Sequence, residues 1–198
     1  QDGDVIVAAA TSRARFSSRF ASGTLPLAGV LLLGGCQTGP SPALGVPGSM
    51  VAGTATQPHV APNRPVTFGS IIVCGSDSTP VTVTDVTLPS STGGLRVSGF
   101  AIRPNPSGIG GAPVGMADAP LTSPLIGVDG VGPGPAAPCE AGGAGGSEVL
   151  VEVRRAAIDD GCAADGIDVH YVSGSDPTEA VLHIPLALAV GEGDAPCT

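Results

Sequence analysis

Two histidines and one aspartate near the C-terminal end are the side chains best placed for metal chemistry. Asp168 and His170 are two residues apart in one alternating apolar run, and His183 lies in the next run. Side chains two residues apart share a face of a strand. If the two runs form a hairpin that turns near Asp176, His183 reaches that face too. Two imidazoles and a carboxylate suit Zn²⁺ or Cu²⁺, so one prediction is a metal or small-ligand site.

The alternative prediction for the same residues is an ordinary polar sheet surface, with both histidines solvated or hydrogen-bonded. The choice depends on the register between the two strands. A slip of one residue moves a side chain to the opposite face. The sequence favours the polar surface and leaves the metal site as the second hypothesis.

Three aspartates, Asp159, Asp160 and Asp165, gather in the loop sequence IDDGCAADG. Oxygen-rich loops can hold Ca²⁺. However, the spacing does not match the D-x-D-x-D-G pattern of a calcium-binding helix–loop–helix site. An acidic turn without calcium is therefore the prediction.

The patterns of common catalytic sites are missing. The chain contains no lysine, so it has neither an S-x-x-K motif nor a P-loop lysine, and it lacks G-x-S-x-G and H-E-x-x-H. The run GIGGAP at 108–113 does not match G-x-G-x-x-G and does not lead into a predicted helix. We therefore predict that the protein is not an enzyme and needs no cofactor.

The stretch Thr11–Cys36 has the layout of a secretory signal. Three arginines (Arg13, Arg15 and Arg19) precede an apolar run, Leu25–Leu33, and two glycines and Cys36 follow it. A positive segment, an apolar segment and small residues before the cleavage point define such signals. The run is too short to cross about 30 Å of hydrocarbon as a helix, which takes roughly 20 apolar residues.

The last four residues of this stretch, Leu33-Gly34-Gly35-Cys36, resemble the lipobox of bacterial lipoproteins. The resemblance implies that the Cys36 thiol carries a diacyl lipid and that residues 1–35, including an upstream extension at 1–10, are removed. It also implies a membrane anchor on the extracytoplasmic face of the cell membrane. Gly34 stands where Ala, Ser or Thr is commoner in the family. The resemblance covers the export signal and not the rest of the chain.

Four further cysteines, Cys74, Cys139, Cys162 and Cys197, would then lie in an exported domain. An even number of cysteines in oxidising surroundings predicts two disulfides. Three connectivities are possible, and we favour Cys74–Cys139 and Cys162–Cys197. No C-x-x-C pair and no histidine beside a cysteine points to a thiolate metal site.

The charge balance narrows the range of partners. The chain of 198 residues has a net charge of −9, and all eight basic residues are arginines. Without residues 1–35, which hold three arginines and two aspartates, five arginines face fifteen acidic residues. Such a surface repels nucleic acid and anionic lipid alike. Membrane attachment would therefore depend on Cys36.

Short alternating or β-branched runs predict the secondary structure. Six strands are expected, at 66–74, 81–88, 95–103, 148–155, 167–172 and 179–190. A change of phase indicates a bulge near Asp85, and Gly99 is a second candidate. Pro185 lacks an amide donor, so its strand is expected to lie at an edge or to be bulged there.

The predicted fold is an all-β, antiparallel β-sandwich of immunoglobulin-like topology at 66–198, behind a disordered Pro/Gly-rich linker at 36–65. Within it, segment 104–147 either contains a short strand at 125–128 or is a mobile loop. The predicted function is a non-catalytic binding or accessory module that meets an envelope protein. Recognition would use segment 104–147 or the edge at Pro185.

Overall fold

The structure is a computed structural model that describes residues 43–47, 53–106, 113–140, 145–156 and 160–191. These residues belong to one unit, Pro40–Thr198, and contain strands and turns but no α-helix. The strands are β1 (Leu44–Gly45), β2 (Gly53–Gln57), β3 (Val66–Gly75), β4 (Val81–Thr87), β5 (Arg96–Pro104), β6 (Met116–Ala117), β7 (Gly134–Ala136), β8 (Ser147–Arg154), β9 (Gly161–Ala163), β10 (Ile167–Ser173), β11 (Asp176–Ile184) and β12 (Leu186–Val190). In this part of the chain, no helix has the length and apolarity needed to cross a membrane. The predicted all-β class is confirmed.

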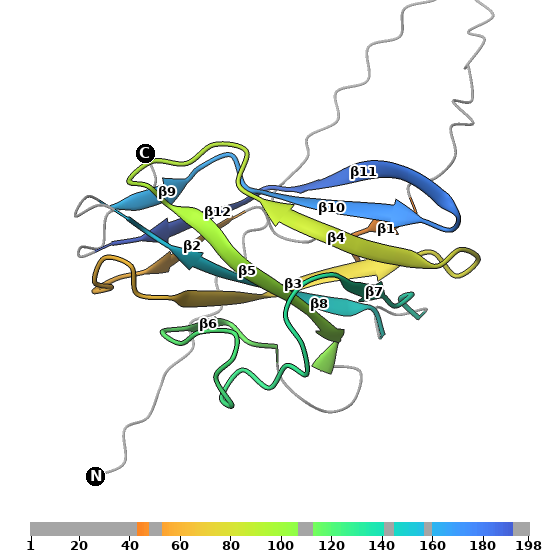
Figure 1. The fold of residues 1–198 in the computed structure, drawn as a ribbon, viewed down its shortest axis with the longest axis horizontal. Helices are drawn as coiled ribbons and strands as arrows, with labels where there is room; N and C mark the ends of the chain where they lie inside the picture. The colour runs from red at the N-terminus through yellow and green to blue at the C-terminus, as the bar shows by residue number, and fades with distance from the viewer. Residues whose placement is uncertain (1–42, 48–52, 107–112, 141–144, 157–159, 192–198) are drawn as a thin grey trace, which may run out of the picture. The chain divides into compact units, whose positions relative to one another are not determined.

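Two antiparallel sheets enclose the main core. The first has the order β1-β3-β8-β5, with β6 added beside β3, and the second has the order β11-β10-β4-β7. Alternate residues of each strand point into the space between the sheets, as Val149 and Val151 do from β8 and Val83 and Val169 do from the second sheet. This is the packing of a β-sandwich, and Figure 1 shows the two layers. Its immunoglobulin-like connectivity remains a prediction.

A third, smaller sheet has the order β2-β12-β9. Its pairing of β12 with β2 is parallel, from Leu186 opposite Gly53 to Val190 opposite Gln57. The expected single strand at 179–190 is therefore wrong, because the chain leaves the second sheet at Pro185 and enters the third sheet with β12. Proline cannot donate to a ladder, so it fits the point where one strand becomes two.

The expected linker at 36–65 is wrong for its C-terminal part. Leu44 pairs with Gly75 at the end of β3. Leu44 is fully buried, and Val60 is 1 % exposed. With β2 in the third sheet, residues 44–47 and 53–60 contribute strands and core side chains. Alternation did not reveal them, because β1 is two residues long and β2 is a small polar strand, GTATQ.

Residues 113–128 of segment 104–147 cover the outer face of the first sheet, whereas β7 of the same segment joins the second sheet (Figure 1). The strands of this segment are β6 and β7, so the expected strand at 125–128 is wrong. Leu121 and Ile126 of this segment pack instead with Ala101 and Leu150 in a second apolar cluster. β8 is consequently covered on both faces.

Both expected bulges are present. The pairing of β10 with β4 shifts register between His170 and Tyr171, opposite Asp85 and Val83. The pairing of β5 with β8 shifts between Val97 and Gly99. The expected hairpin turn is also confirmed, since Ser173 lies opposite Asp176.

Candidate functional site

The outer face of β4, β10 and β11 carries the histidines that the sequence singles out. Asp168 lies directly opposite His183 in the register, and their side chains meet at 2.7 Å. His170 lies opposite Val181, and its Nδ1 is 3.2 Å from Glu179 Oε2. The expected trio is therefore divided into two histidine–carboxylate pairs.

The division counts against the metal hypothesis for Asp168, His170 and His183. Within the described ranges, no group of three or more His, Cys, Asp or Glu side chains is arranged to hold a metal ion. The physical reason is the register, which places Val181 rather than a second ligand opposite His170. The acidic loop gives no calcium site in these ranges either: Asp165 accepts a hydrogen bond from Ser90, and Asp159 lies outside the described residues.

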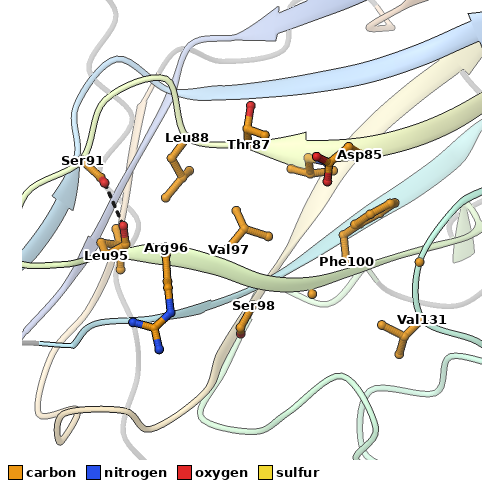
Figure 2. A pocket seen from close by; sticks show the side chains of 13 residues that line it. Asp85, Thr87, Leu88, Ser91, Leu95, Arg96, Val97, Ser98, Phe100 and Val131 are labelled. Atoms are coloured by element: carbon orange, nitrogen blue, oxygen red, sulfur yellow. Dashed lines mark hydrogen bonds between the residues drawn. The ribbon is translucent and has the colours of Figure 1, made fainter. Parts of the chain in front are cut away.

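His170 belongs to a chain of hydrogen bonds across three strands. Its Nε2 is 2.9 Å from Thr87 Oγ1, and Glu179 accepts a hydrogen bond from Thr84 Oγ1 at 2.8 Å. The Thr84 hydroxyl first, and then His170, hold the pKa of Glu179 below its ordinary value. In Figure 2 the Thr87 hydroxyl points away from the nearby groove. We interpret the chain as a cross-strand contact that holds β4, β10 and β11 together.

One of the two predicted disulfides lies within the described residues. Cys74 and Cys139 are bonded, which confirms the predicted pair and ties the end of β3 to segment 104–147. Cys162 is also disulfide-bonded. Cys197, its predicted partner, lies outside the described residues, as does the predicted lipidation residue Cys36.

Two buried glutamates, which the sequence analysis did not single out, fasten segment 104–147 to β8. Glu148 is fully buried, and its Oε1 accepts the N–H groups of Ser70 and Val114 at 2.7 and 2.9 Å. Arg103 donates to its Oε2 through Nε at 2.8 Å and Nη2 at 2.7 Å. Each carboxylate oxygen therefore has a donor, as a buried charge requires.

Glu152, four residues further along β8, is held in a similar way. Burial by itself would raise its pKa, but the Ser98 hydroxyl, the Leu121 N–H and Arg154 outweigh burial and leave the pKa below the ordinary value of 4.5. The sequence signal was present, because Glu148 and Glu152 share the face of β8 that Leu150 occupies between them.

An open groove of about 510 Å³ lies between β4 and β5. In Figure 2, Leu88, Val97 and Phe100 point into the space between the two strands, while Arg96 and Ser98 leave β5 on its other side. Val131 of segment 104–147 also lines the groove and is 52 % exposed. The residues that line the groove thus combine apolar side chains with polar ones, the usual composition of a binding site.

A second hollow, of about 830 Å³, lies at the far end of β10 and β11 near Cys74. Its lining is rich in hydroxyl and carboxylate groups, with Ser76, Asp77, Ser78 and Asp176 among the contributors. The first groove is the stronger candidate for a binding site because it combines several apolar side chains with polar groups.

Searches found no family model, no curated protein and no solved structure that matches the chain. The functional inference therefore depends on the chain's own residues and their geometry.

Proposed function

We propose that this protein is an exported bacterial lipoprotein whose β-sandwich is a non-catalytic binding module, anchored through Cys36 to the outer face of the cytoplasmic membrane. The observation that carries the proposal is the Cys74–Cys139 disulfide, together with the disulfide-bonded state of Cys162. Disulfides persist in oxidising compartments and are rare in the cytosol. The arginine-rich and apolar stretch before Cys36 supplies the matching export signal.

The binding site in this proposal is the groove between β4 and β5. Its partner is an envelope protein that inserts an apolar side chain over Leu88 and Val97 and contacts the polar groups among the lining residues. Val131 brings segment 104–147, one of the two expected recognition elements, into the same site.

The anchor is tested by the mass of the native protein isolated from membranes. We expect a chain that begins at Cys36 and carries fatty acids. An inhibitor of the lipoprotein signal peptidase should leave the uncut precursor, and Cys36→Ser should abolish the lipid-dependent membrane fraction. A native chain that keeps its first 35 residues and bears no lipid would refute the proposal.

The groove is tested by crosslinking the membrane-bound protein in cells and comparing two matched variants. Val131→Asp places a charge on the groove, whereas Val181→Asp places it on β11, and the two valines are 52 % and 51 % exposed. A specific partner should be lost with Val131→Asp and kept with Val181→Asp. Equal recovery with both variants would exclude the groove as the binding site.

A further inference from the structure

Among the described residues the outer edge of β11 has no paired strand, and the sequence around Val181 can pair with itself. β11 ends the order β11-β10-β4-β7, so within the described part of the chain no strand pairs with its other side. Val181 near its middle is 51 % exposed. Pro177 and Pro185 lie four residues before and four residues after Val181. Prolines limit strand pairing because they lack the amide donor.

The same strand from a second copy can pair with this edge, and one register places acidic side chains opposite histidines. In an antiparallel pair centred on Val181, each Glu179 lies opposite His183 of the second copy. Opposite charges facing each other across strands stabilise a sheet. A slip of two residues would place Glu179 opposite Val181 or Pro185 and lose this match.

The match extends onto the neighbouring strands. Asp168 already contacts His183 at 2.7 Å, and Glu179 contacts His170 at 3.2 Å. Pairing of two copies would therefore align a row of side chains that alternate in sign when the histidines are protonated. This row consists of Asp168 and His183 from one copy followed by Glu179 and His170 from the other. The twofold axis generates a second, identical row.

The inner face of the edge is also self-complementary. Ala180 and Leu182 are partly buried and pack against the main core. In the register centred on Val181, each Ala180 faces Leu182 of the second copy, which continues the apolar layer between the sheets.

We propose that two copies of this chain associate through β11, pairing antiparallel about Val181 so that their four-stranded sheets become one continuous sheet. The contact is isologous, as a twofold axis requires. It uses a surface separate from the groove between β4 and β5. An edge contact of this kind is smaller than a standard interface of about 1,600 Å², so the dimer should be weak and should depend on concentration.

Sedimentation of the full mature chain in detergent tests the association, up to about 100 μM because the interface is small. The wild-type protein should shift from monomer to dimer as its concentration rises. Val181→Asp brings two like charges together on the axis and should weaken the dimer at least about tenfold. Val131→Asp, the matched control, should leave it unchanged.

Cysteine crosslinking tests the register and does not depend on the stability of the aspartate variant. Opposed Cα atoms in antiparallel strands are about 4.5–5.5 Å apart, within the range that a disulfide spans. Under mild oxidation Val181→Cys should form a covalent dimer. Thr178→Cys, on the same edge but about 20 Å from its counterpart at roughly 3.4 Å per residue, should not. A wild-type chain that stays monomeric, or Val181→Cys that crosslinks no better than Thr178→Cys, would overturn the proposal.

Discussion

At the scale of single residues, the fold depends on two carboxylates inside a strand that is otherwise apolar. Glu148 and Glu152 alternate with the valines of β8 and face segment 104–147 instead of the main core. Each accepts a backbone N–H from this segment, at Val114 and Leu121. These side chains substitute for a regular ladder where the covering layer has little β-structure, because buried backbone donors need partners.

Glu148→Gln should destabilise the protein by about 3–5 kcal/mol, because Arg103 then faces a neutral group in a buried site. Urea denaturation measures the loss. The control is Arg64→Gln, which breaks the exposed pair Arg64–Asp118 at 3.1 Å. Loss of an exposed ion pair costs about 0–1 kcal/mol. Equal effects of the two variants would show that the Glu148 contacts contribute little.

Glu152 should make stability depend on pH in the acid range. Its folded pKa lies below the ordinary value of 4.5, so the folded state favours the ionised form. The stability that it contributes is therefore complete above about 4.5 and is lost as the pH falls through the lower folded pKa. Denaturation midpoints from pH 6 to pH 2.5 should fall less steeply for Glu152→Gln than for the wild type. Parallel pH profiles would contradict this assignment.

At the scale of elements, β8 is the central strand of the first sheet and has a packed layer on each face. The layer formed by residues 113–128 approaches β3 closely, with Gly69 N–H donating to Gly115 O at 2.8 Å. A Cβ on Gly69 would lie 2.1 Å from the Val114 carbonyl oxygen and 2.7 Å from Glu148 Oε1. Glycine at this position therefore allows the two layers to meet.

Gly69→Ala should cost at least about 2 kcal/mol, since relief of the clash requires the backbone of the covering layer to move. Gly115→Ala is the matched control, because a Cβ there meets nothing within 4 Å. Thermal unfolding of the two variants gives the comparison. If Gly69→Ala and Gly115→Ala unfold at the same temperature, the close approach of the layers is not required for stability.

Sequence reasoning was accurate where the signal was local. Alternation located β4, β8 and β10, the change of phase near Asp85 predicted a bulge, and the turn near Asp176 followed from its residues. It failed where position depends on distant segments. Nothing in GTATQ distinguishes a strand from a linker until β12 is beside it, and the pairing of His170 with Glu179 follows from a register that the sequence leaves open.

At the scale of the whole unit, residues 43–47 and 53–65 are part of the folded body. Leu44 and Val60 are buried, β2 extends the third sheet, and the Val60 carbonyl accepts from Arg155 Nε at 3.0 Å. The compact unit that contains these residues begins at Pro40.

A chain shortened to residues 66–198 should therefore be at least about 3 kcal/mol less stable than one that begins at residue 40, since burial of Leu44 and Val60 contributes about 1.5–3 kcal/mol each. Chemical denaturation of both chains measures this, with a chain that begins at residue 36 as the control. The chains that begin at residue 36 and at residue 40 should have the same free energy of unfolding. If the chain that begins at residue 66 is equally stable, residues 43–47 and 53–60 contribute nothing to the stability of the fold.

The central place of β8 has a consequence for how the chain acquires its structure. Val66 pairs with Val153 and Arg96 pairs with Arg154, across 87 and 58 positions of sequence. A chain made from its N-terminus must therefore hold β3 and β5 without their shared neighbour until β8 has emerged. Closure over such distances is slow, in the range of milliseconds to seconds for strand-rich domains. Nascent intermediates that lack β8 should thus be the species most dependent on chaperones.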